Sequence, residues 1–173
     1  MQKKNRFIPV NRPLIGSQEL SNVKKCIEEG WISSSGNFIK KFENDLSKKV
    51  NRKFGVAVSS GTGAIDIAIK SLNLKKDDEI IVPNFTIISS VNEIVRQGLK
   101  PIFIEANLDD FNIDTNLIEK KINKKTKAIM VVHIYGMPSN MLKIMNLSRK
   151  YNLKIIEDCA EQLGQKFNNK MIG

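Results

Sequence analysis

The sequence predicts an α/β fold in which a mainly parallel β-sheet is flanked by helices. From Phe54 onward, short apolar runs alternate with segments long enough for crossover helices, which is the pattern of repeated βαβ units. The chain has 173 residues, 41% of them hydrophobic, so it is long enough to bury one core. The expected strands are FGVAV at 54–58, EIIVP at 79–83, KPIFIEA at 100–106, KAIMVV at 127–132 and LKII at 153–156.

Two helices are expected before the first strand. Ser17 is a suitable N-cap for the first helix and Gly30 is placed to end it, while the second begins near Asn37. The apolar positions with helical spacing are Leu20, Val23 and Ile27 in the first helix and Phe38, Phe42 and Leu46 in the second. Farther along, Asp114 or Thr115 is expected to cap a helix, and Pro138 is expected to start another.

The net charge of +10 is the only feature that suggests nucleic-acid binding. The basic residues form no arginine stripe with interleaved aromatic residues, and the lysines occur largely in pairs, as on solvated helix faces. Six such pairs are Lys24-Lys25, Lys40-Lys41, Lys48-Lys49, Lys75-Lys76, Lys120-Lys121 and Lys124-Lys125. We therefore expect no nucleic-acid partner.

Cysteine use and hydropathy indicate the compartment. Cys26 and Cys159 form no metal-spaced pair, so neither a disulfide framework nor a zinc site is indicated and a cytoplasmic location is expected. Residues 1–16 lack the apolar core of a signal peptide, and no run reaches the roughly 20 apolar residues of a membrane span. We expect no membrane insertion.

The segment SSGTG at 59–63 lies between an expected strand and an expected helix. Gly61 and Gly63 allow close backbone approach, Thr62 adds a hydroxyl, and a helix start attracts anions, so a phosphate is one possible ligand. The segment matches neither the P-loop nor the dinucleotide fingerprint. An ordinary strand-to-helix turn explains the same residues equally well.

Two further polar or aromatic positions follow expected strands. Residues 83–90 are placed to line the same crevice, where Phe85 either faces a planar ligand or, as is more usual, belongs to the core. His133 is the only histidine, and it is either a polar wall of the pocket or a structural histidine with satisfied ring nitrogens.

The acidic segment after the last strand carries the strongest prediction of chemistry. Asp158 ends an apolar strand, where ligands gather in open α/β sheets, and a buried carboxylate there requires a cationic partner such as a protonated pyridine nitrogen. Glu161 follows three residues later and faces the same ligand if the turn is helical. Glu157 is interpreted as a solvated acid or a helix cap.

Five ordered blocks resemble the amino-terminal half of the DegT-type sugar aminotransferases, a pyridoxal-phosphate family with the aspartate aminotransferase fold, and are most similar to perosamine synthases. The blocks are WISSSG from 31, VSSGTGAIDIAI from 58, DEIIVPNFTIISSVNEI from 78, NIDTNLIEKKINKKTKAIMVVHIYGMPSNM from 112 and IIEDCAEQLGQKFNNKMIG from 155. The resemblance implies an amino-terminal arm of residues 1–36, with a helix and a loop, and an incomplete cofactor domain of residues 37–173.

The resemblance also implies roles for single residues around pyridoxal 5′-phosphate. The backbone around Gly61, Thr62 and Gly63 is expected to hold the phosphate, and Asp158 is expected to pair with the pyridine nitrogen. Glu161 occupies the position near the ring hydroxyl. The position that commonly carries a stacking aromatic residue is Ile87 here, which leaves apolar contact, with Phe85 as a possible substitute.

The implied reaction is amino transfer from a donor such as glutamate to a nucleotide-linked 4-keto-6-deoxy sugar. The family lysine that forms the Schiff base is expected beyond residue 173, because Lys166 and Lys170 belong to a hairpin motif, so this chain is expected to be inactive alone. The complete form is expected to be a homodimer. Two alternatives are a partner subunit that completes its site with another chain and a sugar dehydratase of the same family.

Overall fold

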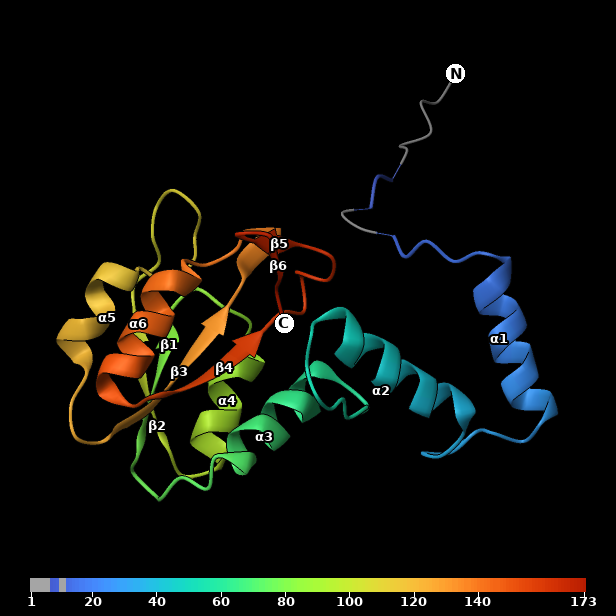
Figure 1. Ribbon diagram of the computed structural model, residues 1–173, viewed down its shortest axis with the longest axis horizontal. Helices are drawn as coiled ribbons and strands as arrows, with labels where there is room; N and C mark the ends of the chain where they lie inside the picture. Colours follow the sequence, from blue (N-terminus) through green and yellow to red (C-terminus); the bar gives the residue numbers. More distant parts are fainter. Residues whose placement is uncertain (1–6, 10–11) are drawn as a thin grey trace. The chain divides into compact units, whose positions relative to one another are not determined.

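The computed structural model describes residues 7–9 and 12–173, and Figure 1 shows their course. The chain separates into two compact units, Met1–Phe42 and Glu43–Gly173, which are described separately below. The division into an arm of residues 1–36 and a cofactor domain of residues 37–173 stays a prediction. No helix among the described residues is long and apolar enough to cross a membrane.

The first unit contains α1 (Ser17–Glu28), and none of the residues of this helix is buried. The prediction that Ser17 is the N-cap is wrong, because the Glu19 carboxylate accepts the N–H of Gly16 at 2.8 Å and fixes the cap one residue earlier. Gly30, with φ of +75°, follows the helix end as predicted. The apolar side chains of α1 are Leu20, Val23 and Ile27, which are 69%, 58% and 65% exposed.

The helix α2 (Asn37–Lys49) begins at the predicted residue, but the strand predicted at 54–58 does not form. Ala57 donates its N–H to the Glu43 carboxylate at 2.8 Å rather than to a neighbouring strand. A Cβ on Gly55 would clash with the backbone oxygen of Glu43, so this segment packs closely on α2. A strand needs a hydrogen-bonding partner, which an apolar pattern alone does not supply.

Four parallel strands form the central sheet of the second unit, as predicted. They pair in the order β2-β1-β3-β4, and their bounds are β1 (Glu79–Pro83), β2 (Lys100–Ile104), β3 (Thr126–Val132) and β4 (Lys154–Asp158). The pairing of β3 with β4 places Val131 opposite Glu157 and Val132 opposite Asp158. Because successive side chains point to opposite faces, the two acids of β4 face opposite sides of the sheet.

The helices cover both faces of this sheet (Figure 1). One face packs on α3 (Gly61–Ser71) and α4 (Ile88–Arg96), and the other on α5 (Thr115–Lys121) and α6 (Met141–Tyr151). The first core cluster includes Ile69, Ile94 and Met130, and the second includes Ile118, Ile129 and Ile144. Each fully buried isoleucine contributes about 1.5–3 kcal/mol through burial of apolar surface.

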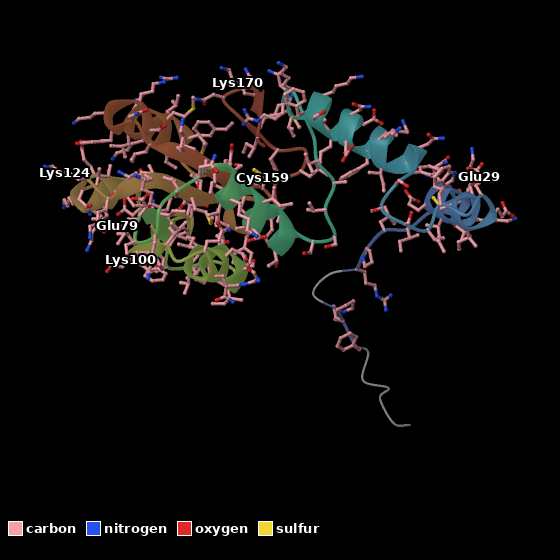
Figure 2. The ribbon with its side chains drawn as sticks, turned by 90° about the horizontal axis from the view of Figure 1, so that it is seen from below. Glu29, Glu79, Lys100, Lys124, Cys159 and Lys170 are labelled. Carbon is pink, nitrogen blue, oxygen red and sulfur yellow. The ribbon has the colours of Figure 1, made fainter. Side chains whose placement is uncertain are left out.

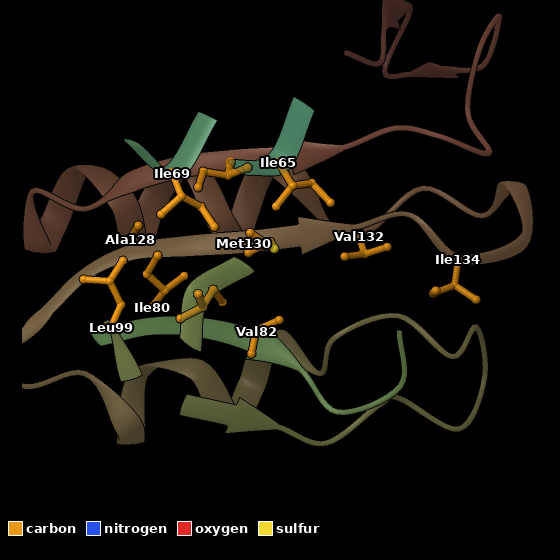
Figure 3. Packing of buried hydrophobic residues seen from close by; sticks show 11 residues of the cluster. Ile65, Ile69, Ile80, Val82, Leu99, Ala128, Met130, Val132 and Ile134 are labelled. Atoms are coloured by element: carbon orange, nitrogen blue, oxygen red, sulfur yellow. The ribbon is translucent and has the colours of Figure 1, made fainter. Parts of the chain in front are cut away.

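The direction of α3 is visible in the packing close-up. Along β3, Ala128, Met130 and Val132 follow one another, with Ile69 beside Ala128 and Ile65 nearer Val132 (Figure 3). The helix therefore runs against the strand direction. Its N-terminus lies toward the carboxyl ends of the strands, the edge where ligands bind in open α/β sheets.

Turn and cap chemistry explains the remaining boundaries. Asp114 caps α5, since its side chain accepts the N–H of Asn116 at 2.9 Å. The predicted start of a helix at Pro138 is wrong by a few residues, because Asn140 caps α6 by accepting the N–H of Lys143 at 3.2 Å. The expected hairpin motif forms β5 (Lys166–Phe167) and β6 (Lys170–Met171), an antiparallel pair with both turn asparagines at positive φ.

The paired lysines are exposed, as the sequence predicts. All twelve residues of the six pairs named above are exposed. Figure 2 shows Lys124 and Lys170 at the outside of the second unit, whereas Cys159 lies deeper. The positive charge is therefore spread over solvated helix and loop surfaces.

Candidate cofactor site

A cavity of about 350 Å³ opens at the carboxyl ends of β1, β3 and β4. It brings together three of the predicted site residues, Ile87, Asp158 and Glu161, from separate loops. The full lining is Phe85, Thr86, Ile87, Val132, His133, Ile134, Tyr135, Asp158, Ala160 and Glu161. The crevice predicted from the ends of the apolar strands is therefore present.

Asp158 is held in place by donors from two elements. Its Oδ1 accepts the N–H of Ala160 at 3.1 Å, and its Oδ2 accepts the Ser90 hydroxyl at 3.5 Å. Ser90 is fully buried in α4, and its oxygen lies 3.4 Å from the Thr86 hydroxyl. The contact of Ser90 with Asp158 was not predicted, because the two residues are 68 positions apart in the sequence and meet only in the folded chain.

His133 lines the cavity with a buried ring whose two nitrogens both have partners. Nδ1 accepts the N–H of Ser139 at 3.0 Å, and Nε2 lies 3.1 Å from Oε1 of Glu157. Because Nδ1 is the acceptor, the neutral ring carries its proton on Nε2 and donates it to Glu157. Both interpretations of this histidine hold, since it forms a wall of the cavity and its ring is satisfied.

Glu157 is not the solvated acid or helix cap that the sequence suggested. Its side chain is only 15% exposed, and its Oε2 lies 3.5 Å from Nη2 of Arg52. The strand pairing explains the difference, because β4 lies against β3 and brings Glu157 beside His133. A neighbouring cation and an N–H donor together stabilise the carboxylate at this depth.

A metal ion is disfavoured at this cluster. Ligand atoms of His133, Glu157 and Cys159 lie within 4.8 Å of one another. However, Arg52 already supplies positive charge to Glu157, and the ring proton occupies Nε2. In the metal-free protein, burial, followed by the nearby charges of Glu157 and Asp158, raises the pKa of the Cys159 thiol to about 12, so the thiol is protonated near neutral pH.

The predicted phosphate segment begins α3. The Ser60 hydroxyl accepts the N–H of Gly63 at 3.2 Å, which makes Ser60 the N-cap. Gly61 and Thr62 are exposed, and a Cβ on Gly61 would meet no atom within 4 Å. These residues do not line the cavity that holds Asp158, although the direction of α3 places its start at the same edge of the sheet (Figure 3).

Glu161 joins the end of β4 to the loop after β3. Its Oε2 accepts the N–H of Tyr135 at 2.6 Å, a short charge-assisted hydrogen bond. Tyr135 lies in η1 (Ile134–Gly136) with φ of +51°. Ile87 is the N-cap residue of α4 and is 60% exposed, so its side chain offers an apolar surface to the cavity.

Phe85 is not a core residue, contrary to the usual expectation for an aromatic residue after a strand. It is 41% exposed and lines the cavity. Its ring centroid lies 5.8 Å from that of Phe111 and 6.2 Å from that of Tyr135. Neither ring contact was predicted from the sequence, although Phe111 and Tyr135 each follow a strand that ends at the same edge of the sheet.

Solved structures identify the class to which this fold belongs. An aminotransferase from Psychrobacter cryohalolentis is 31% identical, with a TM-score of 0.89 over 93% of this chain and 41% of that chain. The GDP-4-keto-6-deoxy-D-mannose-3-dehydratase of E. coli, solved with bound hydrated pyridoxal phosphate, is 28% identical, with a TM-score of 0.89 over 95% of this chain and 44% of that chain. The fold is that of the fold-type I, pyridoxal-phosphate-dependent aminotransferases.

The sequence comparison gives the family. The profile of the DegT/DnrJ/EryC1/StrS aminotransferase family matches residues 13–173, and the chain belongs to this family. The GDP-perosamine synthase of Escherichia coli O157:H7 is 42% identical over 168 residues, which are 97% of this chain and 46% of that protein. The chain thus spans about half the length of the curated relatives that it matches.

Proposed function

We propose that this chain forms the Asp158 side of a pyridoxal 5′-phosphate site in a nucleotide-sugar aminotransferase. The observation that carries the proposal is the position of the Asp158 carboxylate, which ends β4, accepts two protein donors and lines a cavity of about 350 Å³. Membership of an aminotransferase family supports the same reading.

The chemistry of the donors and acceptors fits this cofactor. A carboxylate has about four acceptor sites, so Asp158 can accept a pyridinium N–H in addition to Ala160 and Ser90. Ile87 and Ala160 also line the cavity and offer apolar contact to a ring. The N-terminus of α3, with its positive dipole end, is suited to the phosphate through the backbone of Gly61, Thr62 and Gly63.

Each of these residues has a definite task in the proposed site. When bound, the cofactor supplies an electron sink for amino-group transfer. Asp158 keeps the proton on the ring nitrogen by offering it a charged acceptor, and Ile87 excludes water from one ring face. We assign Glu161 to the ring hydroxyl through Oε1, since Oε2 already accepts the N–H of Tyr135.

The proposed substrates are a nucleotide-linked 4-keto-6-deoxy sugar and an amino donor such as glutamate. The similarity to a GDP-perosamine synthase supports this choice of sugar. No lysine lines the cavity among the described residues, so we propose that the covalent anchor of the cofactor is supplied from outside this segment. A homodimer and a cytoplasmic location belong to the same proposal.

A second candidate function is sugar dehydration. The observation in its favour is that the solved dehydratase matches with the same TM-score, 0.89, as the solved aminotransferase. Product analysis, carried out with the segment that supplies the covalent anchor present, separates the two reactions. Incorporation of the amino nitrogen of labelled glutamate into the sugar is expected for the aminotransferase, whereas loss of a sugar hydroxyl as water would favour the dehydratase.

The cofactor proposal is tested by titrating pyridoxal phosphate into the purified protein. Asp158→Asn should weaken binding about 10- to 100-fold, because it removes a charge-assisted hydrogen bond of roughly 1.5–3 kcal/mol. Asp109→Asn is a matched control, since Asp109 is an exposed aspartate that does not line the cavity. Equal affinity of wild type and Asp158→Asn would contradict the proposal.

A further inference from the structure

Three aromatic rings are grouped beside the cavity: Phe85 and Tyr135 line it, and Phe111 contacts Phe85. We refer to Phe85, Phe111 and Tyr135 as the aromatic rim. Each member follows a different strand, respectively β1, β2 and β3. Phe85 contacts both of the other rings, with centroid separations of 5.8 and 6.2 Å. The three side chains are 41%, 50% and 72% exposed, so they are not buried as core residues.

Two members of the aromatic rim have an unusual backbone conformation. Phe111 has φ of +59° and Tyr135 has φ of +51°, a region that is unfavourable for bulky side chains. Such conformations persist only where surrounding contacts impose them, and they concentrate at functional sites. The fold therefore holds both residues in a backbone conformation that neither would favour in a free loop.

One buried amide helps to impose both conformations. Asn112 directly follows Phe111, is only 2% exposed, and accepts the N–H of Ile134 on Oδ1 at 3.1 Å. Its Nδ2 donates to the carbonyl oxygen of Met137 at 3.0 Å. Asn112 therefore ties the Phe111 loop to the turn that carries Tyr135, while Glu161 holds the N–H of Tyr135 from the other side.

We propose that the aromatic rim is a second ring-binding subsite, which receives the flat or apolar ring face of the nucleotide-linked substrate. This inference rests on the proposed function. Phe85 and Tyr135 line the same cavity as Asp158, so a ligand that extends outward from the cofactor meets the rim directly. Exposed aromatic faces bind bases and other rings by stacking, and preorganised rings lose little entropy in doing so.

The nucleobase and the hexose of a nucleotide-linked sugar both offer a face that can lie against an aromatic ring. The nucleobase has a π-face, and a deoxy hexose has an apolar face of C–H groups and a methyl group. Three probes separate these sources: GDP-mannose carries a base and a hexose, GDP carries the base without the hexose, and inorganic pyrophosphate carries neither. Each is titrated by calorimetry into the purified protein, with and without pyridoxal phosphate.

Tyr135→Leu and Phe111→Leu should weaken GDP-mannose binding about 10-fold each and leave pyrophosphate binding unchanged, because only ring contacts are lost. Phe103→Leu is the matched control, since Phe103 is 50% exposed like Phe111 but lies outside the aromatic rim, whose ring contacts join Phe85 to Phe111 and to Tyr135. An equal loss with GDP places the rim against the nucleoside and not against the hexose. A loss confined to GDP-mannose identifies the hexose.

The inference is overturned if both rim variants bind GDP-mannose as tightly as the wild type, or if pyrophosphate binding falls equally. It is also overturned if the variants change only the oligomeric state in sedimentation, because the rim would then be a contact between copies. Pyridoxal-phosphate binding is measured in the same samples. If the wild type binds the cofactor but neither nucleotide probe, the proposed subsite at the aromatic rim is contradicted, whereas the proposed cofactor site is not.

Discussion

Nε2 of His133 lies 3.1 Å from Oε1 of Glu157, and this contact joins the loop after β3 to the last residues of β4. The imidazole is buried, and its Nδ1 accepts the N–H of Ser139. The ring therefore acts as a fixed connector between two elements of the cavity wall. With both nitrogens engaged, it is not arranged as an acid or base for a ligand.

A single ring tautomer is expected for His133, with its proton on Nε2. Because the protein has only one histidine, its nitrogen resonances can be assigned without ambiguity in a long-range ¹H–¹⁵N spectrum. Glu157→Gln and Glu157→Leu should both keep this tautomer, because Nδ1 still accepts the N–H of Ser139 in either variant. Glu105→Leu, at an exposed site, is the control, and a wild type protonated on Nδ1 would refute the assignment.

Removal of the Ser90 hydroxyl should weaken pyridoxal-phosphate binding modestly. The hydroxyl donates to Oδ2 of Asp158 at 3.5 Å, and a typical neutral hydrogen bond contributes about 0.5–1.5 kcal/mol, so Ser90→Ala should cost about 2- to 10-fold in affinity. Ser89→Ala, one residue earlier in α4, is the control. A loss as large as that of Asp158→Asn would mean that Ser90 does more than orient the carboxylate.

The Cys159 thiol should make the fold sensitive to alkaline pH. Burial first, and the carboxylates of Glu157 and Asp158 next, raise the pKa of this thiol from 9.0 to about 12. The neutral thiol is thus favoured in the folded state, and its stabilising contribution is complete below pH 9 and is lost as the pH rises from about 9 to about 12. Urea unfolding should show that the free energy of unfolding falls less between pH 8 and pH 10.5 for Cys159→Ala than for the wild type.

Buried and exposed positions of the same helix should differ strongly in how well they tolerate substitution. Ile144 is fully buried in α6, so Ile144→Ala should lower the free energy of unfolding by about 2–5 kcal/mol. Leu142 lies in the same helix but is 57% exposed, so Leu142→Ala should cost much less. Denaturant midpoints measure both changes, and equal losses would contradict the packing of α6 on the sheet.

Much of the fold is predictable because the determining signals are local. The apolar runs at 79–83 and 127–132 are strands, and Asp114 caps its helix through its own side chain. The run at 54–58 has a similar pattern but forms no strand, because pairing depends on a partner elsewhere in the chain. Local patterns thus predict which segments are apolar, and tertiary contacts decide which of them pair.

The candidate site shows the same division. Asp158, Ile87 and Glu161 were expected near one ligand from the strand ends and the family resemblance, and they line one cavity, although their cofactor roles stay predictions. The carboxylate of Glu157 was misjudged because its neighbours Arg52 and His133 are distant in sequence. No periodicity encodes such a contact.

The opposite directions of Glu157 and Asp158 have an evolutionary consequence. A one-residue slip of β4 along β3 would turn every side chain of β4 to the other face, and Glu157 would then replace Asp158 at the cavity. The bond between Glu157 and His133 exists only in the observed alignment. An insertion or deletion within this strand should therefore be far more damaging than most substitutions, because it would exchange the two acids.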